Sequence, residues 1–202
     1  GPGQMYEALA NQVNKQGGSL YLGQEVVEVR HGQGEITAIQ VFGENGSATY
    51  PASHCFSSMP ITELVKRMQP FPPDIVLNAV DSLRYRSIVT VNLLFNKPCS
   101  LRDNWVYLHS PDIKACRLQL YQNWSPDMVP SDNSSSLGFE YFCYEHDDLW
   151  NLSDADLIQL ALQDAQKLGF QAPDNFLDGF VVKYAKAYPM YEEGYEKHMR
   201  II

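Results

Sequence analysis

Four stretches of alternating apolar and polar residues occupy the middle of this sequence and constrain its fold more than any other feature. Val, Ile, Leu, Tyr, Phe and Trp fill them, and clusters of Pro, Asp, Asn and Ser separate each from the next. They cover Tyr85 to Phe95, Trp105 to His109, Cys116 to Asn123 and Leu137 to Tyr144. This composition at period two is typical of strands with one buried face. The pattern predicts an antiparallel sheet of about four strands.

Helices and a β-meander are predicted around this sheet. Met5, Leu9 and Val13 recur at helical spacing until Gly17-Gly18. Further strands are expected at Ser19–Leu22, Val26–Val29, Ile36–Val41, Ala48–Tyr50 and His54–Pro60, and again at Gly179–Ala187. Further helices are expected at Ile61–Met68, Asp74–Leu83 and Ala155–Leu168, the last capped by Ser153. Together they predict an α+β fold.

Composition narrows the class of protein. With 45% apolar residues in 202, the chain can bury a core, and a net charge of −9 disfavours nucleic acid or an anionic membrane as a partner. No apolar stretch approaches the ~20 residues of a membrane helix. The cysteines are widely spaced, without a CxxC pair, at Cys55, Cys99, Cys116 and Cys143. They are interpreted as buried reduced thiols, which predicts a cytoplasmic protein.

No catalytic signature or metal-ligand pattern occurs in the sequence, so it nominates no catalytic residue and no metal site. Arg117 is the unusual residue, because it lies on a predicted strand near several aromatic residues. With Tyr107 and Tyr188 it would form a cage for a phosphate or carboxylate, the arginine donating two hydrogen bonds. The alternative for Arg117 is a side chain that points to water, and for the tyrosines an amphipathic strand edge.

Several segments in order resemble the middle of FAD-dependent amine oxidases, a group that includes protoporphyrinogen oxidases, phytoene desaturases and UDP-galactopyranose mutases. They are Gly1–Met5 with its helix, the Gly17-Gly18 turn, the strand Glu25–Val29 and the exit Cys55–Pro60. The resemblance implies FAD as cofactor, with Val26 at its adenine end and Ser57 and Pro60 near its ADP moiety. Family members carry flavin motifs near both ends that these 202 residues lack. We therefore expect an internal fragment that is inactive and does not retain FAD by itself.

The run from Trp105 through Arg117 to Asn123-Trp124-Ser125-Pro126, followed by Tyr188-Pro189, is most similar to eukaryotic-type UDP-galactopyranose mutases. In those enzymes the positions of Tyr107, Arg117 and Tyr188 hold the substrate diphosphate. The resemblance thus implies a small-molecule substrate, anionic or a nucleotide sugar.

These expectations divide the chain into a partial FAD-binding segment at residues 1–60, a substrate-binding domain at residues 61–187 and a return segment at residues 188–202. The function expected is that of an FAD-dependent oxidoreductase to which this chain contributes the substrate-binding domain. The alternatives are a mutase-like flavin-dependent isomerase and a non-catalytic binding or scaffold module. The isolated fragment is expected to self-associate through surface that the rest of the FAD domain would cover.

Overall fold

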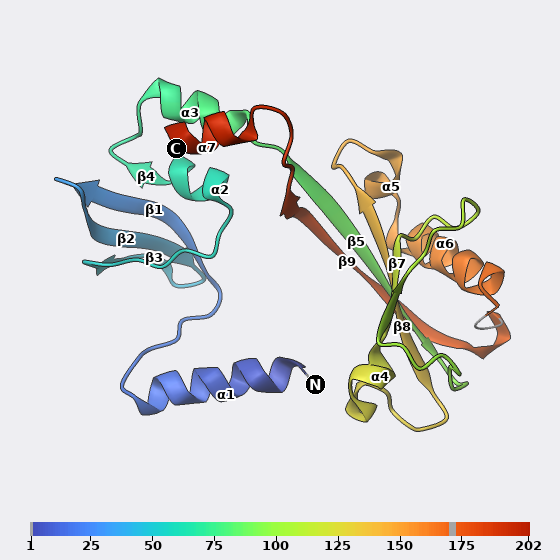
Figure 1. The fold of residues 1–202 in the computed structure, drawn as a ribbon. Coiled ribbons are helices and arrows are strands. Elements are labelled where there is room, and N and C mark those ends of the chain that lie inside the picture. Colours follow the sequence, from blue (N-terminus) through green and yellow to red (C-terminus); the bar gives the residue numbers. More distant parts are fainter. Residues whose placement is uncertain (1, 170–172) are drawn as a thin grey trace. The chain divides into compact units, whose positions relative to one another are not determined.

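The structure, a computed structural model, describes residues 2–169 and 173–202, which fall into two units (Figure 1). One comprises Tyr85–Tyr188 with the N-terminal residues up to Met5, and we call it the sheet unit. The other comprises Tyr6–Arg84 and Pro189–Ile202, and we call it the meander unit. Each contains a β-sheet and helices, so the predicted α+β class is confirmed. None of the helices in the described residues has the length and apolar character needed to cross a membrane.

The sheet unit contains a five-stranded sheet, which includes the strands predicted in the middle of the sequence. Its order is β6-β7-β8-β5-β9. The strands are β5 (Tyr85–Phe95), β6 (Trp105–Tyr107), β7 (Arg117–Leu120), β8 (Ser135–Cys143) and β9 (Phe176–Pro189). The pairs β6/β7, β7/β8 and β5/β8 are antiparallel, as predicted. The late strand predicted at Gly179–Ala187 is longer than expected and joins the sheet beside β5.

Helix α6 (Asp154–Lys167) covers one face of this sheet (Figure 1). Its side chains Leu157, Ala161 and Ala165 recur at helical spacing, and all are buried against alternate residues of β5 and β8. Each large side chain that leaves water in such a layer contributes about 1.5–3 kcal/mol. The other side chains of the strands therefore point to the opposite face, which we call the open face.

Local signals at both ends of α6 act as the sequence predicts. Ser153 Oγ accepts a hydrogen bond from Asp156 N at 3.2 Å, which caps the helix. Gly169, which follows the C-cap residue Leu168, has φ of 71°, a value that glycine adopts without steric cost. These two signals define where the helix begins and ends.

The meander unit contains a four-stranded mixed sheet in the order β3-β2-β1-β4. Its strands are β1 (Gln24–Gly32), β2 (Glu35–Gly43), β3 (Gly46–Pro51) and β4 (Met68–Gln69). The helices of the first 84 residues and the tail are α1 (Pro2–Lys15), α2 (Ile61–Lys66), α3 (Asp74–Asp81) and α7 (Tyr195–Ile201). The predicted meander is confirmed, and its second hairpin turns at Gly46, whose φ is 88°. Gly1, the first residue of the segment that resembles the flavin family, lies outside the described residues.

Several predicted strands are absent or shorter than expected. Residues 19–22 are irregular, and so are residues 54–60, where Phe56 is fully exposed. The edge of the sheet beside β1 is formed by the two-residue strand β4, which pairs with Val29 and Arg30. The strand predicted to reach Asn123 ends at Leu120, because the chain turns into the short helix α4 (Tyr121–Trp124).

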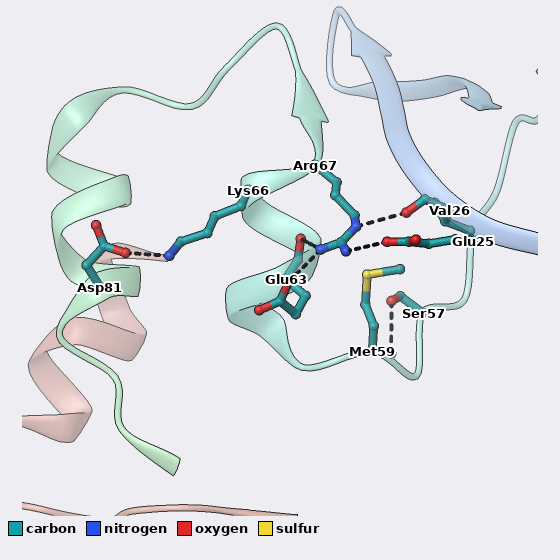
Figure 2. A network of polar contacts seen from close by, with 8 residues as sticks. All are labelled: Glu25, Val26, Ser57, Met59, Glu63, Lys66, Arg67 and Asp81. Carbon is teal, nitrogen blue, oxygen red and sulfur yellow. Dashed lines mark hydrogen bonds and ion pairs between the residues drawn. The ribbon is translucent and has the colours of Figure 1, made fainter. Parts of the chain in front are cut away.

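The compact units do not follow the predicted boundary at residue 61. Helices α2 and α3 belong with the meander, because side chains bind them to each other and to β1. Lys66 and Asp81 form an ion pair of 2.6 Å between α2 and α3, and Arg67 Nε donates to Val26 O at 2.8 Å (Figure 2). The assignment of FAD-binding and substrate-binding roles to the parts remains a prediction.

The remaining short elements are α5 (Asp148–Asn151) and the 3-10 helices η1 (Pro126–Met128) and η2 (Pro173–Asn175). All four cysteines are free. Cys143 is buried as predicted, whereas Cys55 is exposed, because the irregular segment that contains it is not part of a sheet.

Candidate functional site

The open face of the sheet unit gathers aromatic rings and hydrogen-bonding side chains. Its members alternate along the strands with residues buried against α6, which fixes the side on which they lie. They include Trp105 and Tyr107 of β6, Arg117 and Gln119 of β7, Glu140 and Phe142 of β8, Arg86, Thr90 and Asn92 of β5, and Phe180, Tyr184 and Tyr188 of β9. This face is the candidate ligand-binding surface.

Arg117 lies in the middle of one end of the open face, and the carboxylate of Glu140 balances its positive charge. It is directly opposite Glu140 in the antiparallel register, and its Nε and Nη2 both contact Glu140 Oε2. The second oxygen of Glu140 accepts from Gln119 Nε2 at 3.0 Å. Burial acts to lower the Arg117 pKa, but the interactions with Glu140 and Tyr188 outweigh it and raise that pKa. The Arg117 guanidinium is thereby held in place between neighbouring strands.

Aromatic rings surround the Arg117 guanidinium. Its central carbon is 5.7 Å from the ring centroid of Trp105, 6.0 Å from that of Tyr107 and 5.9 Å from that of Phe142. The Phe142 ring in turn contacts Tyr188, with centroids 5.7 Å apart. The three residues predicted to bind substrate, Tyr107, Arg117 and Tyr188, are thus brought together, although their role in binding stays a prediction.

A hollow of about 680 Å³ lies on the open face beside the Arg117–Glu140 pair. It is lined by Thr90, Gln119, Tyr121, Trp124, Ser125, Met128 and Glu140. A second hollow of about 480 Å³ shares Thr90, Tyr121 and Met128 with the first and extends towards β9. The shared lining makes the two hollows parts of one trough. Its size suits a small-molecule ligand.

Tyr121 is the side chain that shapes this trough. It comes from α4, directly after β7, and its hydroxyl donates to Asn92 Oδ1 at 2.8 Å. Its ring lies against Gly138, where a Cβ would come within 2.4 Å of the Tyr121 hydroxyl. Burial, and secondly the charge of Glu140, raise the pKa of Tyr121 to about 12, so the phenol is neutral and remains a donor.

Sequence analysis missed Gln119, Tyr121 and Glu140 as site residues. The available signal was Glu140, an acidic residue within an otherwise apolar and aromatic strand, since a buried carboxylate needs a cationic or hydrogen-bonding partner. Gln119 and Tyr121 gave no such signal, because polar and amphipathic residues at alternate strand positions are ordinary on an exposed face. Trp124 belonged to the run compared with mutases but was not predicted to bind.

The residues predicted to contact a cofactor, Val26, Ser57 and Pro60, lie in the meander unit. The carbonyl of Val26 accepts from Arg67 Nε at 2.8 Å, and Ser57 Oγ accepts from Met59 N at 3.3 Å (Figure 2). The carbonyl of Pro60 accepts from the first turn of α2.

Arg67 organises this region. It also donates to Glu63 Oε2 at 2.6 Å and to Glu25 Oε1 at 3.1 Å, and these hydrogen bonds raise its pKa. Arg67 thus fixes the carbonyl of Val26, whereas Ser57 is exposed on the irregular segment, with its hydroxyl proton left to donate. Backbone and hydroxyl groups of this kind fit the polar nucleotide end of FAD.

The model of a family described as flavin containing amine oxidoreductase matches residues 1–198. Among curated proteins, none has a sequence that matches this one.

Solved structures share the fold at low sequence identity. A reduced UDP-galactopyranose mutase superposes with a TM-score of 0.79 at 15% identity, covering 97% of this chain and 41% of the mutase chain. A protein described as a putative protoporphyrinogen oxidase from Exiguobacterium sp. 255-15 gives 0.61 at 16% identity, covering 88% and 38% of the two chains. An oxidoreductase from Methanosarcina mazei gives 0.65 at 14% identity, covering 88% and 40%. The chain thus spans about two fifths of the length of these similar structures.

Proposed function

Because the chain belongs to the flavin containing amine oxidoreductase family, we propose that its sheet unit is the substrate-binding domain of an FAD-dependent oxidoreductase. In this proposal the meander unit contributes part of the FAD-binding domain. The open face would be the substrate wall of an active site that is completed by parts of the family fold beyond this chain.

One observation carries the proposal: the trough on the open face has a hydrogen-bonding floor whose charges are already compensated. Glu140 is 7% exposed and is engaged by Arg117 and Gln119, so the floor does not need a ligand for its own stability. Preorganised groups of this kind orient a ligand without a cost of reorganisation.

The chain's own residues would bind and orient the substrate. Gln119, Thr90 and Tyr121 offer hydrogen-bonding groups on the floor, and Trp124 and Met128 provide apolar walls that exclude water. When bound, FAD supplies the redox chemistry. Val26, Ser57 and Pro60 would hold its nucleotide end through the backbone and hydroxyl groups described above.

The test uses the natural protein at its full length. Flavin absorbance of the purified protein is expected, and a panel of amine and nucleotide-sugar ligands is titrated against it. Trp124→Ala should weaken the binding of the ligand that perturbs the flavin spectrum by about tenfold. Phe71→Ala, at an exposed aromatic residue of the meander unit, serves as control and should bind that ligand as the wild type does. A colourless protein that takes up no added FAD would overturn the proposal and favour a binding or scaffold module.

A second candidate function is flavin-dependent isomerisation of a UDP-sugar, as in the mutase whose fold this chain resembles. The observation that favours it is the grouping of Tyr107, Arg117 and Tyr188 around one end of the open face. A guanidinium and two phenols are suitable donors for a diphosphate.

Replacing Arg117 tests this candidate. Arg117→Ala should weaken binding of UDP-galactopyranose to the full-length protein by roughly 1.5–3 kcal/mol, the range for hydrogen bonds to charged groups. Arg117→Ala also leaves Glu140 without its cationic partner. Arg117→Lys is therefore the cleaner variant, because lysine keeps the positive charge but lacks the paired donors of the guanidinium. An affinity for UDP-galactopyranose equal to that of the wild type in both variants would exclude the isomerase assignment.

A further inference from the structure

Asn92, on β5, is a buried amide in the floor of the trough, with 7% of its surface exposed. Its Oδ1 accepts a hydrogen bond from the Tyr121 hydroxyl at 2.8 Å. Its Nδ2 has no hydrogen-bond partner within residues 2–169 and 173–202. Because a buried donor without a partner costs free energy, this half of the amide is suited to a ligand that accepts a hydrogen bond.

Tyr121 fixes which half of the Asn92 amide is left for a ligand. Burial, and secondly the charge of Glu140, raise the pKa of Tyr121 to about 12, so the phenol keeps its proton and donates to Oδ1. The Tyr121 ring also lies against Gly138, where no Cβ is present to displace it. The amide is therefore held with its NH2 group, which can only donate, available to other partners.

The hollow of about 480 Å³ beside Asn92 combines hydroxyl groups with apolar walls. Thr90 and Ser136, on β5 and β8, contribute the hydroxyl groups. Phe180 and Tyr184, on β9, are 63% and 60% exposed, so their rings can pack against a ligand. A flat, mostly apolar molecule with one polar group suits such a lining.

Among the described residues, charged side chains lie beside this hollow but do not line it. Glu140, bound by Arg117, lines the larger hollow of the trough. Asp127 and Asp178, both exposed to water, line a third hollow of about 360 Å³ that includes Asn92. In the part of the chain that the structure describes, no basic side chain lines any of the three hollows.

These surroundings disfavour a charged ligand group at Asn92. A carboxylate or phosphate would lose water there without gaining a cationic partner, and an ammonium group would meet a donor where it needs an acceptor. The attraction of the two exposed aspartates for a cation is screened by water. An uncharged acceptor avoids both costs.

We propose that Asn92 is a specificity-determining residue of the trough, which selects an uncharged ligand group with a hydrogen-bond acceptor, such as a carboxamide carbonyl. Its Nδ2 donates to that acceptor, and Phe180 and Tyr184 pack against the flat body that carries it. The inference rests on the proposed use of the open face for substrate.

The experiment compares three probes of similar shape and different charge: benzamide is neutral, benzoate is an anion and benzylamine is a cation at pH 8. Their binding to the full-length protein is titrated by ligand-observed nuclear magnetic resonance. The wild type should bind benzamide about tenfold more tightly than either of the other two probes.

Asn92→Asp keeps an acceptor for Tyr121 but replaces the donor with a negative charge. It should weaken benzamide binding about tenfold and strengthen benzylamine binding, which reverses the preference. Asn92→Leu removes donor and acceptor and should weaken benzamide without any gain for benzylamine. Asn11→Asp, which adds the same charge at an exposed position of α1, is the matched control and should bind all three probes as the wild type does.

The preference of the wild type tests the inference without any variant. Equal affinity for the three probes would overturn it, as would a wild type that does not bind benzamide at millimolar concentration. Unchanged benzamide affinity in Asn92→Asp and Asn92→Leu, or an equal loss in Asn11→Asp, would do the same. Thermal melting shows whether a variant is folded, and if Asn92→Asp is not, Asn92→Leu and the wild-type preference decide the question.

The proposed function and this inference can fail separately, because the flavin spectrum and the effect of Trp124→Ala are measured without these probes. A colourless protein that binds benzamide through Asn92 would overturn the oxidoreductase and keep the specificity assigned to Asn92. A flavoprotein that binds the three probes equally would do the reverse.

Discussion

Arg117 and Glu140 face each other across β7 and β8, and the arginine binds a single carboxylate oxygen, Oε2, through two of its nitrogens. Their side chains are 19% and 9% exposed. The two charges therefore attract each other in surroundings that hold little water. Removal of either one would leave the other without an ionic partner.

Removal of Arg117 alone should destabilise the sheet unit. Arg117→Ala leaves the Glu140 carboxylate with Gln119 as its remaining partner, and we expect a loss of about 3 kcal/mol, the lower end for a broken buried pair. Chemical denaturation followed by circular dichroism measures it. The double variant Arg117→Met with Glu140→Leu should recover most of this loss, because no charge is stranded.

The pair Arg30–Glu28 in β1 provides the control, since its side chains are 47% and 27% exposed. Arg30→Ala should cost less than about 1 kcal/mol, as exposed ion pairs do. A cost equal to that of Arg117→Ala would contradict the view that burial makes the Arg117–Glu140 pair important.

Gly138 is required by the position of Tyr121. In Gly138→Ala the new Cβ would lie 2.4 Å from the Tyr121 hydroxyl and 2.8 Å from its Cζ, so the ring must move and lose Asn92. We expect a loss of about 1–3 kcal/mol in unfolding free energy, as in other overpacked sites. Gly32→Ala, where nothing lies within 4 Å, is the control.

The clash has a specific signature. In the background of Tyr121→Ala, the substitution Gly138→Ala should cost almost nothing, because the ring that it meets is absent. Additive effects of the two changes would show that Gly138 is constrained by something other than Tyr121.

Tyr121 should make stability depend on pH above pH 10. Its pKa is raised to about 12 in the folded protein, against 10.0 for an unperturbed tyrosine, so only the unfolded chain releases this proton between pH 10 and 12. The neutral phenol thus stabilises the fold fully below pH 10, and that contribution is lost as the pH rises to 12. It amounts to about 2 kcal/mol after allowance for partial solvent screening.

Tyr121→Phe checks this dependence, because it removes the ionisable group and keeps the ring. The unfolding free energy of the variant should fall less between pH 10 and 12 than that of the wild type. Absorbance titration at alkaline pH should likewise lose one late-ionising tyrosine. Parallel pH profiles of the two proteins would refute the prediction.

Asp164 of α6 should be essential for the loop before β7. Its carboxylate is fully buried and its Oδ2 accepts from Ala115 N at 3.0 Å, from Lys114 N at 3.2 Å and from the Tyr141 hydroxyl at 3.2 Å. Asp164→Ala strands three donors, and we expect a loss of about 3–5 kcal/mol. Hydrogen exchange of the Lys114 and Ala115 amides should accelerate.

Asp154→Ala, an exposed change in the first turn of the same helix, is the control and should cost less than about 1 kcal/mol. Tyr141→Phe should fall between the two, since it removes one donor and leaves two in place. Slow exchange of the two loop amides in Asp164→Ala would show that another group holds this segment.

Periodicity predicted the elements that bury one face along their whole length. The alternation in β5 and β8 and the helical spacing of Leu157, Ala161 and Ala165 reflect burial between the sheet and α6, and a local pattern records such burial directly. The strand predicted at residues 54–60 failed for the converse reason: Phe56, its largest apolar residue, is fully exposed. Local propensity does not reveal which segments pair with a sheet.

The candidate site was predicted in part. Tyr107, Arg117 and Tyr188 do lie together, because Tyr107 and Arg117 are paired in the β6/β7 register and Tyr188 reaches them through Phe142. Glu140 and Tyr121 were missed, although they decide the charge and the shape of the trough. Their importance depends on partners that are distant in sequence.

The sequence alone determined the long strands and helices that bury one face and which side of each is apolar, since these properties follow from neighbours one to four positions away. It also determined that an arginine would lie among aromatic residues. Tertiary structure alone decided what that arginine binds: the β7/β8 register brings Glu140, 23 positions along the chain, opposite Arg117. It likewise placed Tyr121 over Gly138, because long-range pairing sets which side chains meet.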